Sequence, residues 1–321
     1  MFDPTSSLSF ALSITLPIFI VLFIGTWLRK IGFITDAFVD VGSKLVFNVT
    51  LPALLFVSIV NSDINFGKSL SLVIYGILST IVVYILLEIA VPLMCKDRSS
   101  RGVMVQGAFR GNMGIIGLAY CVNAYGDAVY STAAIYIALV TIFYNIFSVT
   151  TLTRWSDKNS NSSKIAMIKS VLLGVAKNPL IIAIACALII NQLHVPIPEI
   201  IQQSGQYFAR MTLPLALLVA GAGLSLKFNA DLTYAAITTT AKLIVIPMAV
   251  TAVAWLLDIK GMELGVIFLM SSAPSASASF VMARSIGGNY TLAANIIVLT
   301  TVLSLFTTST GTALLRSWSL M

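Results

Sequence analysis

Long apolar segments alternate with short polar connections along almost the whole chain. Ten of these segments approach the roughly 20 mostly apolar residues that a helix needs to cross a membrane. They lie near residues 10–28, 41–60, 69–93, 101–122, 129–153, 166–190, 202–223, 231–257, 262–284 and 291–315. The pattern predicts an all-α integral membrane protein with ten transmembrane helices.

The second half of the chain repeats the first half at an offset of 162 residues. This predicts two copies of one five-helix unit, residues 1–153 and 166–321, joined by a polar linker at 154–165 that is rich in Ser and Asn. Because five is an odd number, the second copy would enter the membrane inverted. The identities at this offset include Pro17 with Pro179, Pro52 with Pro214, Gly126 with Gly288 and Arg154 with Arg316.

Composition supports a lipid environment. Hydrophobic residues make up 58% of the chain and charged residues 10%, against about 25% charged residues in an average soluble domain. The sequence pI is about 9.4, but the basic residues lie between apolar segments and form no patch with interleaved aromatic residues. We therefore expect a lipid bilayer, and no nucleic acid, as the large partner.

The basic residues also predict the topology, because cytoplasmic loops carry an excess of Lys and Arg. With the N-terminus outside the cytoplasm, twelve basic residues fall at the cytoplasmic side, and only Lys68, Lys260 and Arg316 fall at the opposite side. Both termini are therefore predicted to be non-cytoplasmic.

The fourth predicted span, 101–122, contains a stretch that a membrane helix tolerates poorly. Arg110 and Asn112 are polar, and glycines occupy positions 111, 114 and 117. A glycine in a helix interior costs roughly 1 kcal/mol relative to alanine, and irregular backbone at this depth persists only inside the protein or beside a wet cavity. Shifted by 162 residues, Asn112 falls on Pro274 in the ninth span, where proline removes a backbone donor. Both spans are predicted to break at matching positions.

Two broken spans related by a repeat indicate the binding site of a secondary transporter. Each break would present a half-helix N-terminus, whose free N–H groups favour an anion by roughly 0.3–1 kcal/mol. The alternative is that these small residues only let helices pack closely, but packing does not require Asn112 opposite Pro274. The candidate substrate-binding residues at the breaks are Arg110, Gly111, Asn112, Met113, Gly114, Pro274, Ser275, Ser277 and Ser279.

Three further residues are candidates for the same cavity. Asn48 and Arg210 correspond at the 162-residue offset, each one turn before the repeated Thr-Leu-Pro, and Asn145 is polar within the fifth span. Arg110 has a second interpretation as a cap for the first half-helix, and Arg210 a second one as an interfacial side chain that reaches toward water. Lys44, Lys242 and Asn145 are the weaker candidates.

No catalytic or metal-binding motif is present, so we predict neither an enzyme nor a cofactor. Apart from Asp231 and Glu263 in the first turns of their spans, Glu88 is the one acidic residue inside a predicted span, and it lies near the span's end. This disfavours proton exchange through carboxylates, while a cage of neutral oxygens for Na⁺ stays open. Coupling to H⁺ or to Na⁺ is therefore undecided.

The motifs of the chain resemble the auxin efflux carrier family, which includes plant PIN proteins and bacterial malate and malonate permeases. The resemblance rests on Gly-Asn-Met-Gly-Ile-Ile-Gly-Leu at 111–118, Tyr-Gly-Asp at 125–127, the segment 48–56 and Ala273-Pro274 before 280–284. It covers the whole chain. Two positions depart from the family pattern, because Ala119 and Ser279 stand where many relatives have proline.

The resemblance implies two inverted five-helix repeats. In this plan helices 1, 2, 6 and 7 form a scaffold, and helices 3–5 and 8–10 move as an elevator-like transport unit. Substrate would bind where the broken fourth and ninth helices cross, with Asn112 as the crossover asparagine and Gly117, Ala119 and Pro274 at the hinges. A homodimer would use the scaffold helices. The short linker favours a bacterial-type carrier in the inner membrane.

Three functional hypotheses follow. The first is a secondary carrier for a small organic carboxylate. The second is a Na⁺-coupled organic anion symporter of the bile-acid-transporter type, which shares the ten-helix plan. The third is a membrane receptor that senses an anion without transporting it.

Overall fold

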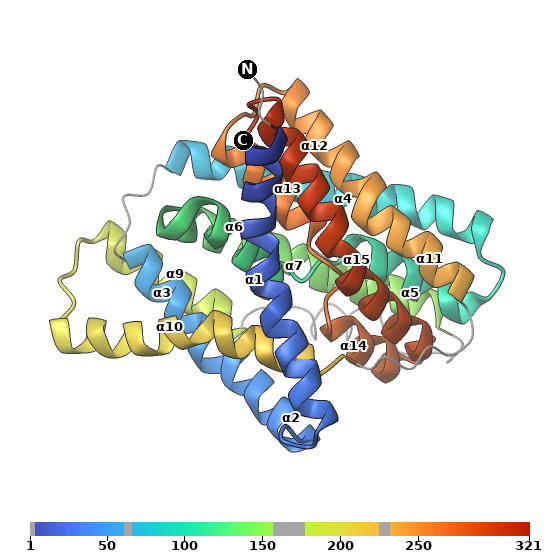
Figure 1. Ribbon diagram of the computed structural model, residues 1–321, viewed down its shortest axis with the longest axis horizontal. Helices are drawn as coiled ribbons and strands as arrows, with labels where there is room; N and C mark the ends of the chain where they lie inside the picture. The colour runs from blue at the N-terminus through green and yellow to red at the C-terminus, as the bar shows by residue number, and fades with distance from the viewer. Residues whose placement is uncertain (1–3, 61–65, 157–176, 225–231) are drawn as a thin grey trace.

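The computed structural model describes residues 4–60, 66–156, 177–224 and 232–321. All regular elements in these ranges are helices (Figure 1). The expected span at 166–190 and the linker at 154–165 lie only partly inside the described ranges. The described part of that span is a helix that begins at Pro179.

The first half of the chain builds helices whose ends follow local signals. α5 begins after Asp97, whose side chain accepts a hydrogen bond from the Ser99 N–H as an N-cap. The elements are α1 (Pro4–Lys30), α2 (Asp36–Leu45), the π-helical η1 (Val46–Thr50), α3 (Leu51–Val60), α4 (Phe66–Met94), α5 (Arg98–Phe109), the π-helical η2 (Met113–Gly117), α6 (Leu118–Tyr125), η3 (Gly126–Val129) and α7 (Tyr130–Trp155).

The second half follows a similar order of helices. Shifting α5 by 162 residues gives 260–271, close to the observed α13, and shifting α7 gives 292–317, close to the observed α15. The elements are α9 (Pro179–Gln192), α10 (Glu199–Ala222), α11 (Leu232–Thr240), the π-helical η4 (Ala241–Val245), α12 (Ile246–Leu256), α13 (Met262–Ser272), α14 (Ala278–Ile286) and α15 (Tyr290–Ser317).

Two of the π-helical segments lie shortly before a proline. η1 ends two residues before Pro52, and η4 ends two residues before Pro247. A proline inside a helix removes one hydrogen bond and clashes with the preceding turn, whereas Pro17, Pro92 and Pro214 lie inside helices assigned as α throughout. η4 also carries Lys242, which is buried.

Six helical segments in the described ranges are long and apolar enough to span a membrane. They are Ser7–Lys30, Asp36–Val60, Leu70–Met94, Met113–Trp155, Leu232–Leu256 and Tyr290–Ser317. α9 and α13 are apolar but shorter. α10, which corresponds to the seventh expected span, is not among these segments, because its first half carries Glu199, three glutamines and Arg210. The protein is an integral membrane protein, while the full set of ten spans stays a prediction.

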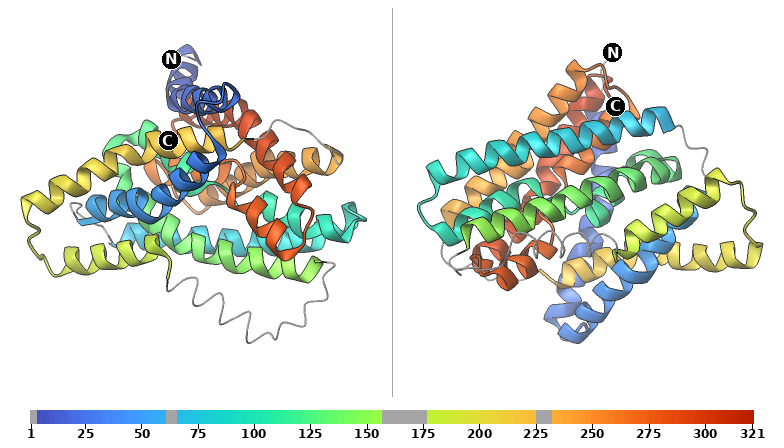
Figure 2. Two further views of the ribbon diagram at one scale, coloured as in Figure 1. Left: turned by 90° about the horizontal axis from the view of Figure 1, so that it is seen from below. Right: turned by 180° about the vertical axis from the view of Figure 1, so that it is seen from behind.

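The helices form two packing groups. α3 packs against α9 and α10, whereas α4 packs against α7 and α5, and α11 and α13 pack against α15. In Figure 1 the blue and yellow helices α2, α3, α9 and α10 lie together at the lower left, and Figure 2 shows the same separation from behind. α1 runs between the groups and packs on both α10 and α15.

α5 and α13 form the centre of the larger group. All residues from Gly102 to Phe109 in α5 and from Leu264 to Met270 in α13 are buried. A helix buried on all sides lies in the protein interior and not at its lipid-facing surface. Both of these central helices end abruptly, and their ends place the candidate site.

Candidate functional site

Both central helices break where the sequence predicts. α5 ends at Phe109, and Arg110 is extended, with ψ of 94°. Asn112 has φ of −79° and ψ of 61° before the next helical segment begins at Met113. α13 ends at Ser272, and Ala273 has an extended ψ of 137°, so that α14 begins only at Ala278.

The two breaks cross and are hydrogen-bonded to each other. Gly111 and Ser275 form an antiparallel β-bridge. The Asn112 N–H donates to the Pro274 carbonyl at 2.7 Å, and the Ala276 N–H donates to the Arg110 carbonyl at 3.1 Å. Backbone groups freed by the helix breaks therefore find partners in each other, as buried backbone requires. Pro274 serves this crossing with its carbonyl and is not part of the cavity wall.

A cavity of about 600 Å³ lies beside the crossing. Its wall is built from the first break together with α2, α7, α10, α14 and α15. Of the candidate residues, six line it: Arg110, Gly111, Asn112, Met113, Gly114 and Ser277. Arg29, Asp36 and Arg284 also line this cavity, and Arg29 forms an ion pair with Asp36. The structure thus brings the residues of the first break to one cavity.

Asn112 presents its side chain to this cavity. The residue is 8% exposed, and its backbone carbonyl accepts bonds from the Ile116 and Gly117 N–H groups. In the part of the chain that the structure describes, no protein group bonds to its carboxamide. Buried amides normally have hydrogen-bond partners. Since the Asn112 carboxamide has none among the described groups, it is free to bind a ligand.

Arg110 is buried at the same break and is 8% exposed. Its Nη1 donates to the Tyr144 carbonyl at 3.3 Å and to the Ser148 hydroxyl at 3.1 Å, both on α7. Its Nε atom is buried without a partner. The described ion pairs do not include Arg110. The guanidinium is anchored to α7 but its charge is not compensated by a described carboxylate.

The N-terminus of the helix after the first break also faces the cavity. Met113, Gly114 and Ile115 open η2, and all three line the cavity. The first N–H groups of a helix have no acceptor within it, and they carry partial positive charge. At the second break, Ser277 and Ala278 bring the start of α14 to the same cavity. Arg110 and the two helix starts therefore contribute positive charge to the cavity wall, and Asp36 and Asp40 of α2 contribute carboxylates to the same wall.

Lys242 is the site residue that sequence reasoning underrated. It is 1% exposed, and its Nζ donates to the Ser271 carbonyl at 3.0 Å at the end of α13. A Cβ atom added to Gly111 would lie 3.0 Å from this Nζ, so the amine lies directly behind the crossing. The feature of the sequence that could have identified Lys242 is a lysine in the middle of an apolar span.

The other candidates lie outside the cavity. Asn48 is exposed, and its side chain donates to the Lys44 carbonyl of its own helix at 2.8 Å. Asn145 is half-buried on α7, and Ser279 is buried on α14 with an unpaired hydroxyl. Arg210 is exposed and lines a different cavity of about 580 Å³ with Asp127. Ser275 lies in the crossing, where its hydroxyl donates to the Gly107 carbonyl at 2.6 Å.

The two hinge candidates after the first break are both buried. Gly117 ends η2, and a Cβ atom there would lie 3.0 Å from the Met270 sulfur, so the glycine permits close contact with α13. Ala119 is the second residue of α6. The helix resumes at Met113, before Ala119, although position 119 carries no proline.

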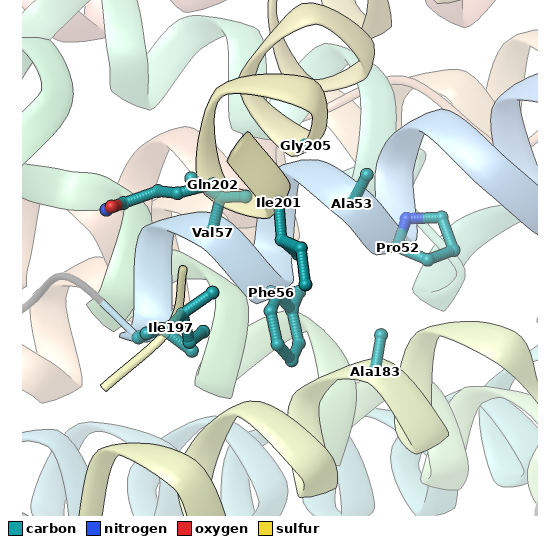
Figure 3. Close-up of a pocket in the computed structure, with 10 residues that line it drawn as sticks. Pro52, Ala53, Phe56, Val57, Ala183, Ile197, Ile201, Gln202 and Gly205 are labelled. Atoms are coloured by element: carbon teal, nitrogen blue, oxygen red, sulfur yellow. The ribbon is translucent and has the colours of Figure 1, made fainter. Parts of the chain in front are cut away.

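A third cavity, between α3, α9 and α10, differs in character (Figure 3). It measures about 270 Å³, and apolar side chains such as Phe56 and Ile201 surround it. The carboxamide of Gln202 points away from the Phe56 ring in this view. Since no charged group lines this cavity, it offers an anion nothing to bind.

Comparison with known proteins matches almost the whole chain. A family model described as "Membrane transport protein" matches residues 10–310. The uncharacterized transporter YfdV of Escherichia coli is 23% identical over 282 residues, which cover 86% of this chain and 88% of that protein. The uncharacterized transporter MJ1031 of Methanocaldococcus jannaschii is 24% identical over 303 residues, which cover 92% and 95%.

Proposed function

The chain belongs to the auxin efflux carrier family of membrane transport proteins, and on this basis we propose that it is a secondary carrier for a small organic carboxylate. Its substrate binds beside the crossing of the two broken helices. The carrier works by alternating access, with an elevator-like movement of one packing group against the other.

One observation carries this proposal: two buried cations flank the crossing without a described carboxylate partner. Arg110 and Lys242 are 8% and 1% exposed. None of the three described ion pairs, Arg29–Asp36, Arg154–Glu88 and Lys260–Asp258, includes either cation. A buried arginine within a membrane costs at least about 2.5 kcal/mol unless it is paired or hydrated. An anionic substrate lowers that cost, so the site favours an anion over a neutral molecule or a cation.

The cavity residues suggest how a carboxylate is held. The planar guanidinium of Arg110 matches two carboxylate oxygens. The Asn112 carboxamide donates a further hydrogen bond, while the N–H groups at the start of η2 stabilise the negative charge. The volume of about 600 Å³ suits a small metabolite, since small-molecule sites commonly measure about 300–1,000 Å³.

The charges around the cavities suggest the direction in which each one opens. The substrate cavity includes Arg29 and Arg284, which the distribution of basic residues predicts at the cytoplasmic side. The cavity with Arg210 and Asp127 belongs to the predicted outer side. On this interpretation, the substrate cavity is open to the cytoplasm, and the other cavity is the outer vestibule.

The two packing groups provide the parts of an elevator. α1, α2, α3, α9 and α10 would be the scaffold, while α4–α7 and α11–α15 would carry the crossing as the moving unit. Residues 1–153 and 166–321 would be the two inverted repeats, and both termini would face away from the cytoplasm across a bacterial inner membrane. The correspondence of helix ends at the 162-residue offset supports this plan.

The test is uptake of labelled carboxylates into proteoliposomes after a binding screen of malonate, malate, acetate and indole-acetate by thermal shift. We expect at least one carboxylate to bind and to exchange across the membrane, and Asn112→Ala to abolish or strongly weaken both. Gln203→Ala is the matched control, because Gln203 is an exposed amide outside the cavity. Normal binding and uptake by Asn112→Ala would refute the site.

A further inference from the structure

The end of α13 at the crossing is a place where a membrane carrier commonly binds a cation. The last carbonyls of a helix have no intrahelical donor, and they carry the negative end of the helix dipole. In transporters with broken helices, such half-helix ends and unwound carbonyls coordinate the coupling Na⁺ or H⁺. α13 ends at Ser272, directly before the second break.

An amine of the protein already occupies this place. The Nζ of Lys242 donates to the Ser271 carbonyl at 3.0 Å. The position of a Cβ atom on Gly111 would lie 3.0 Å from that Nζ, 3.3 Å from the Ala273 carbonyl oxygen and 3.5 Å from the Met270 carbonyl oxygen. The amine and these carbonyls therefore surround one spot between the end of α13 and the first break.

Lys242 comes from outside the two broken helices. It lies in the π-helical η4, whose five residues precede Ile246 and Pro247. Its side chain is almost completely buried, at 1% exposure, and it is not part of any described ion pair. The negative end of the α13 dipole favours a cationic side chain at this place. The apolar span around Lys242 would by itself accept an apolar residue.

The end of α5 offers an internal comparison. There the Gly107 carbonyl accepts a hydrogen bond from the Ser275 hydroxyl at 2.6 Å, so the donor is neutral. At the end of α13 the donor is an amine. At the 162-residue offset Lys242 corresponds to Thr80, whose hydroxyl only bonds to the Gly76 carbonyl of its own helix at 2.7 Å. Of these two corresponding positions, only Lys242 delivers a cationic side chain to a half-helix end.

We propose that the ammonium group of Lys242 is a built-in cation that takes the place of a coupling metal ion at the end of α13. The inference rests on the proposed function, since it concerns the same crossing. The inference concerns which cation serves that site. The positive charge of Lys242 stays with the transport unit as the unit moves, and carboxylate binding requires neither Na⁺ nor K⁺. A Na⁺ ion at this spot would meet both the ammonium charge and a carbonyl that is already occupied.

The test measures thermal unfolding of the purified protein in NaCl, KCl and choline chloride, without any carboxylate. We expect the wild-type Tm to be the same in all three salts. Lys242→Ala removes the ammonium and uncovers the carbonyls, so we expect its Tm to rise in NaCl relative to choline chloride, because an ion that binds only the folded state stabilises it. Thr80→Ala, the change at the corresponding position, should show no such rise.

Two further variants keep the inference testable if Lys242→Ala does not fold. Lys242→Arg keeps the charge and should stay insensitive to Na⁺, whereas Lys242→Ser is smaller and neutral and should gain the Na⁺ response. A Na⁺-specific rise in the wild-type Tm would overturn the inference, and so would the same salt response in Lys242→Arg and Lys242→Ser. These outcomes do not depend on carboxylate binding. Failure of the anion site would instead appear as normal uptake by Asn112→Ala, so the two failures can be told apart.

Discussion

The two breaks at the centre of the molecule have the same backbone plan but different chemistry. The first break places Arg110 and Asn112 against the cavity. Arg110 bonds to the Tyr144 carbonyl and the Ser148 hydroxyl but to no described carboxylate, and the Asn112 carboxamide has no described protein partner. At the second break, the Pro274 carbonyl and the Ser275 hydroxyl are bonded to the first break and its flank, and of its serines only Ser277 lines the cavity. On the proposed function, the first break binds the substrate, while the second break mainly completes the crossing.

This division has a physical reason. If the proposed carboxylate is the substrate, one molecule of it cannot satisfy free polar groups at both breaks at the same time. If both breaks kept free polar groups, one set would lie buried without a partner, at a cost of about 1–3 kcal/mol for each group. Filling the second break with internal bonds avoids that cost. Four substitutions would break or sharpen the comparison between the breaks, and they follow in order of expected effect.

Arg110→Gln should have the largest effect, because it removes the cation from the break that faces the cavity. A hydrogen bond to a charged group contributes about 1.5–3 kcal/mol, so affinity for the best carboxylate of the screen should fall by about 10- to 100-fold. Isothermal titration measures the loss. Lys260→Gln is the control, because Lys260 is paired with Asp258 at an exposed site. Unchanged affinity in Arg110→Gln would show that the guanidinium only caps the half-helix.

Ser275→Ala tests whether the second break is structural. The change leaves the Gly107 carbonyl without its 2.6 Å hydroxyl donor, which should destabilise the protein by about 1–3 kcal/mol. Thermal unfolding should show a lower Tm. Ser277→Ala is the contrast, since Ser277 lines the cavity and should change carboxylate affinity more than Tm. The reverse pattern would place the ligand at Ser275.

Gly111→Ala tests how tightly the breaks are packed together. Its new Cβ would lie 3.0 Å from the Lys242 Nζ and 3.3 Å from the Ala273 carbonyl oxygen. Overpacking in a core costs about 1–3 kcal/mol, and we expect the lower end because a lysine tip can yield. At Gly114 a Cβ would meet only Leu51, at 3.7 Å, so Gly114→Ala should leave Tm nearly unchanged. Equal Tm values for both variants would contradict the close crossing.

Asp97→Ala should have the smallest effect, because it acts at the far end of α5 from the break. Burial raises the pKa of the Asp97 carboxyl, but hydrogen bonds from Ser100 and Ser99 outweigh burial and hold this pKa below its ordinary value. Loss of an N-cap costs about 0.5–2 kcal/mol, and solvent exposure of Asp97 places it at the lower end.

The sign of the pH effect at Asp97 follows from its lowered pKa. The carboxylate contributes stability above the unfolded pKa of about 3.9, and this contribution is lost as pH falls through the lower folded value. The difference in Tm between wild type and Asp97→Ala should therefore be present at neutral pH and shrink in acid. Ser285→Ala, an exposed serine on α14, is the control. A Tm difference that grows in acid would contradict the assignment.

Sequence reasoning located the breaks but only part of the site. Asn112 and Pro274 were predicted correctly as break positions, because glycine and proline act on the backbone locally. Asn48 and Arg210 were expected in the cavity, yet Asn48 bonds to its own helix and Arg210 lines another cavity. Lys242 received little weight, although it reaches the crossing. Whether a polar side chain on a helix faces a cavity depends on the helix's rotation and neighbours, which a span of apolar residues does not encode.

By itself the sequence determined that the protein lies in a membrane, that it is helical, and that two spans related by a 162-residue offset are interrupted. Those properties follow from apolar composition and from backbone preferences of single residues. Only the tertiary structure decided that Gly111 pairs with Ser275, that the cavity lies beside the first break, and that Lys242 caps α13. These features join segments that are distant along the chain, and their positions depend on how the helices pack together.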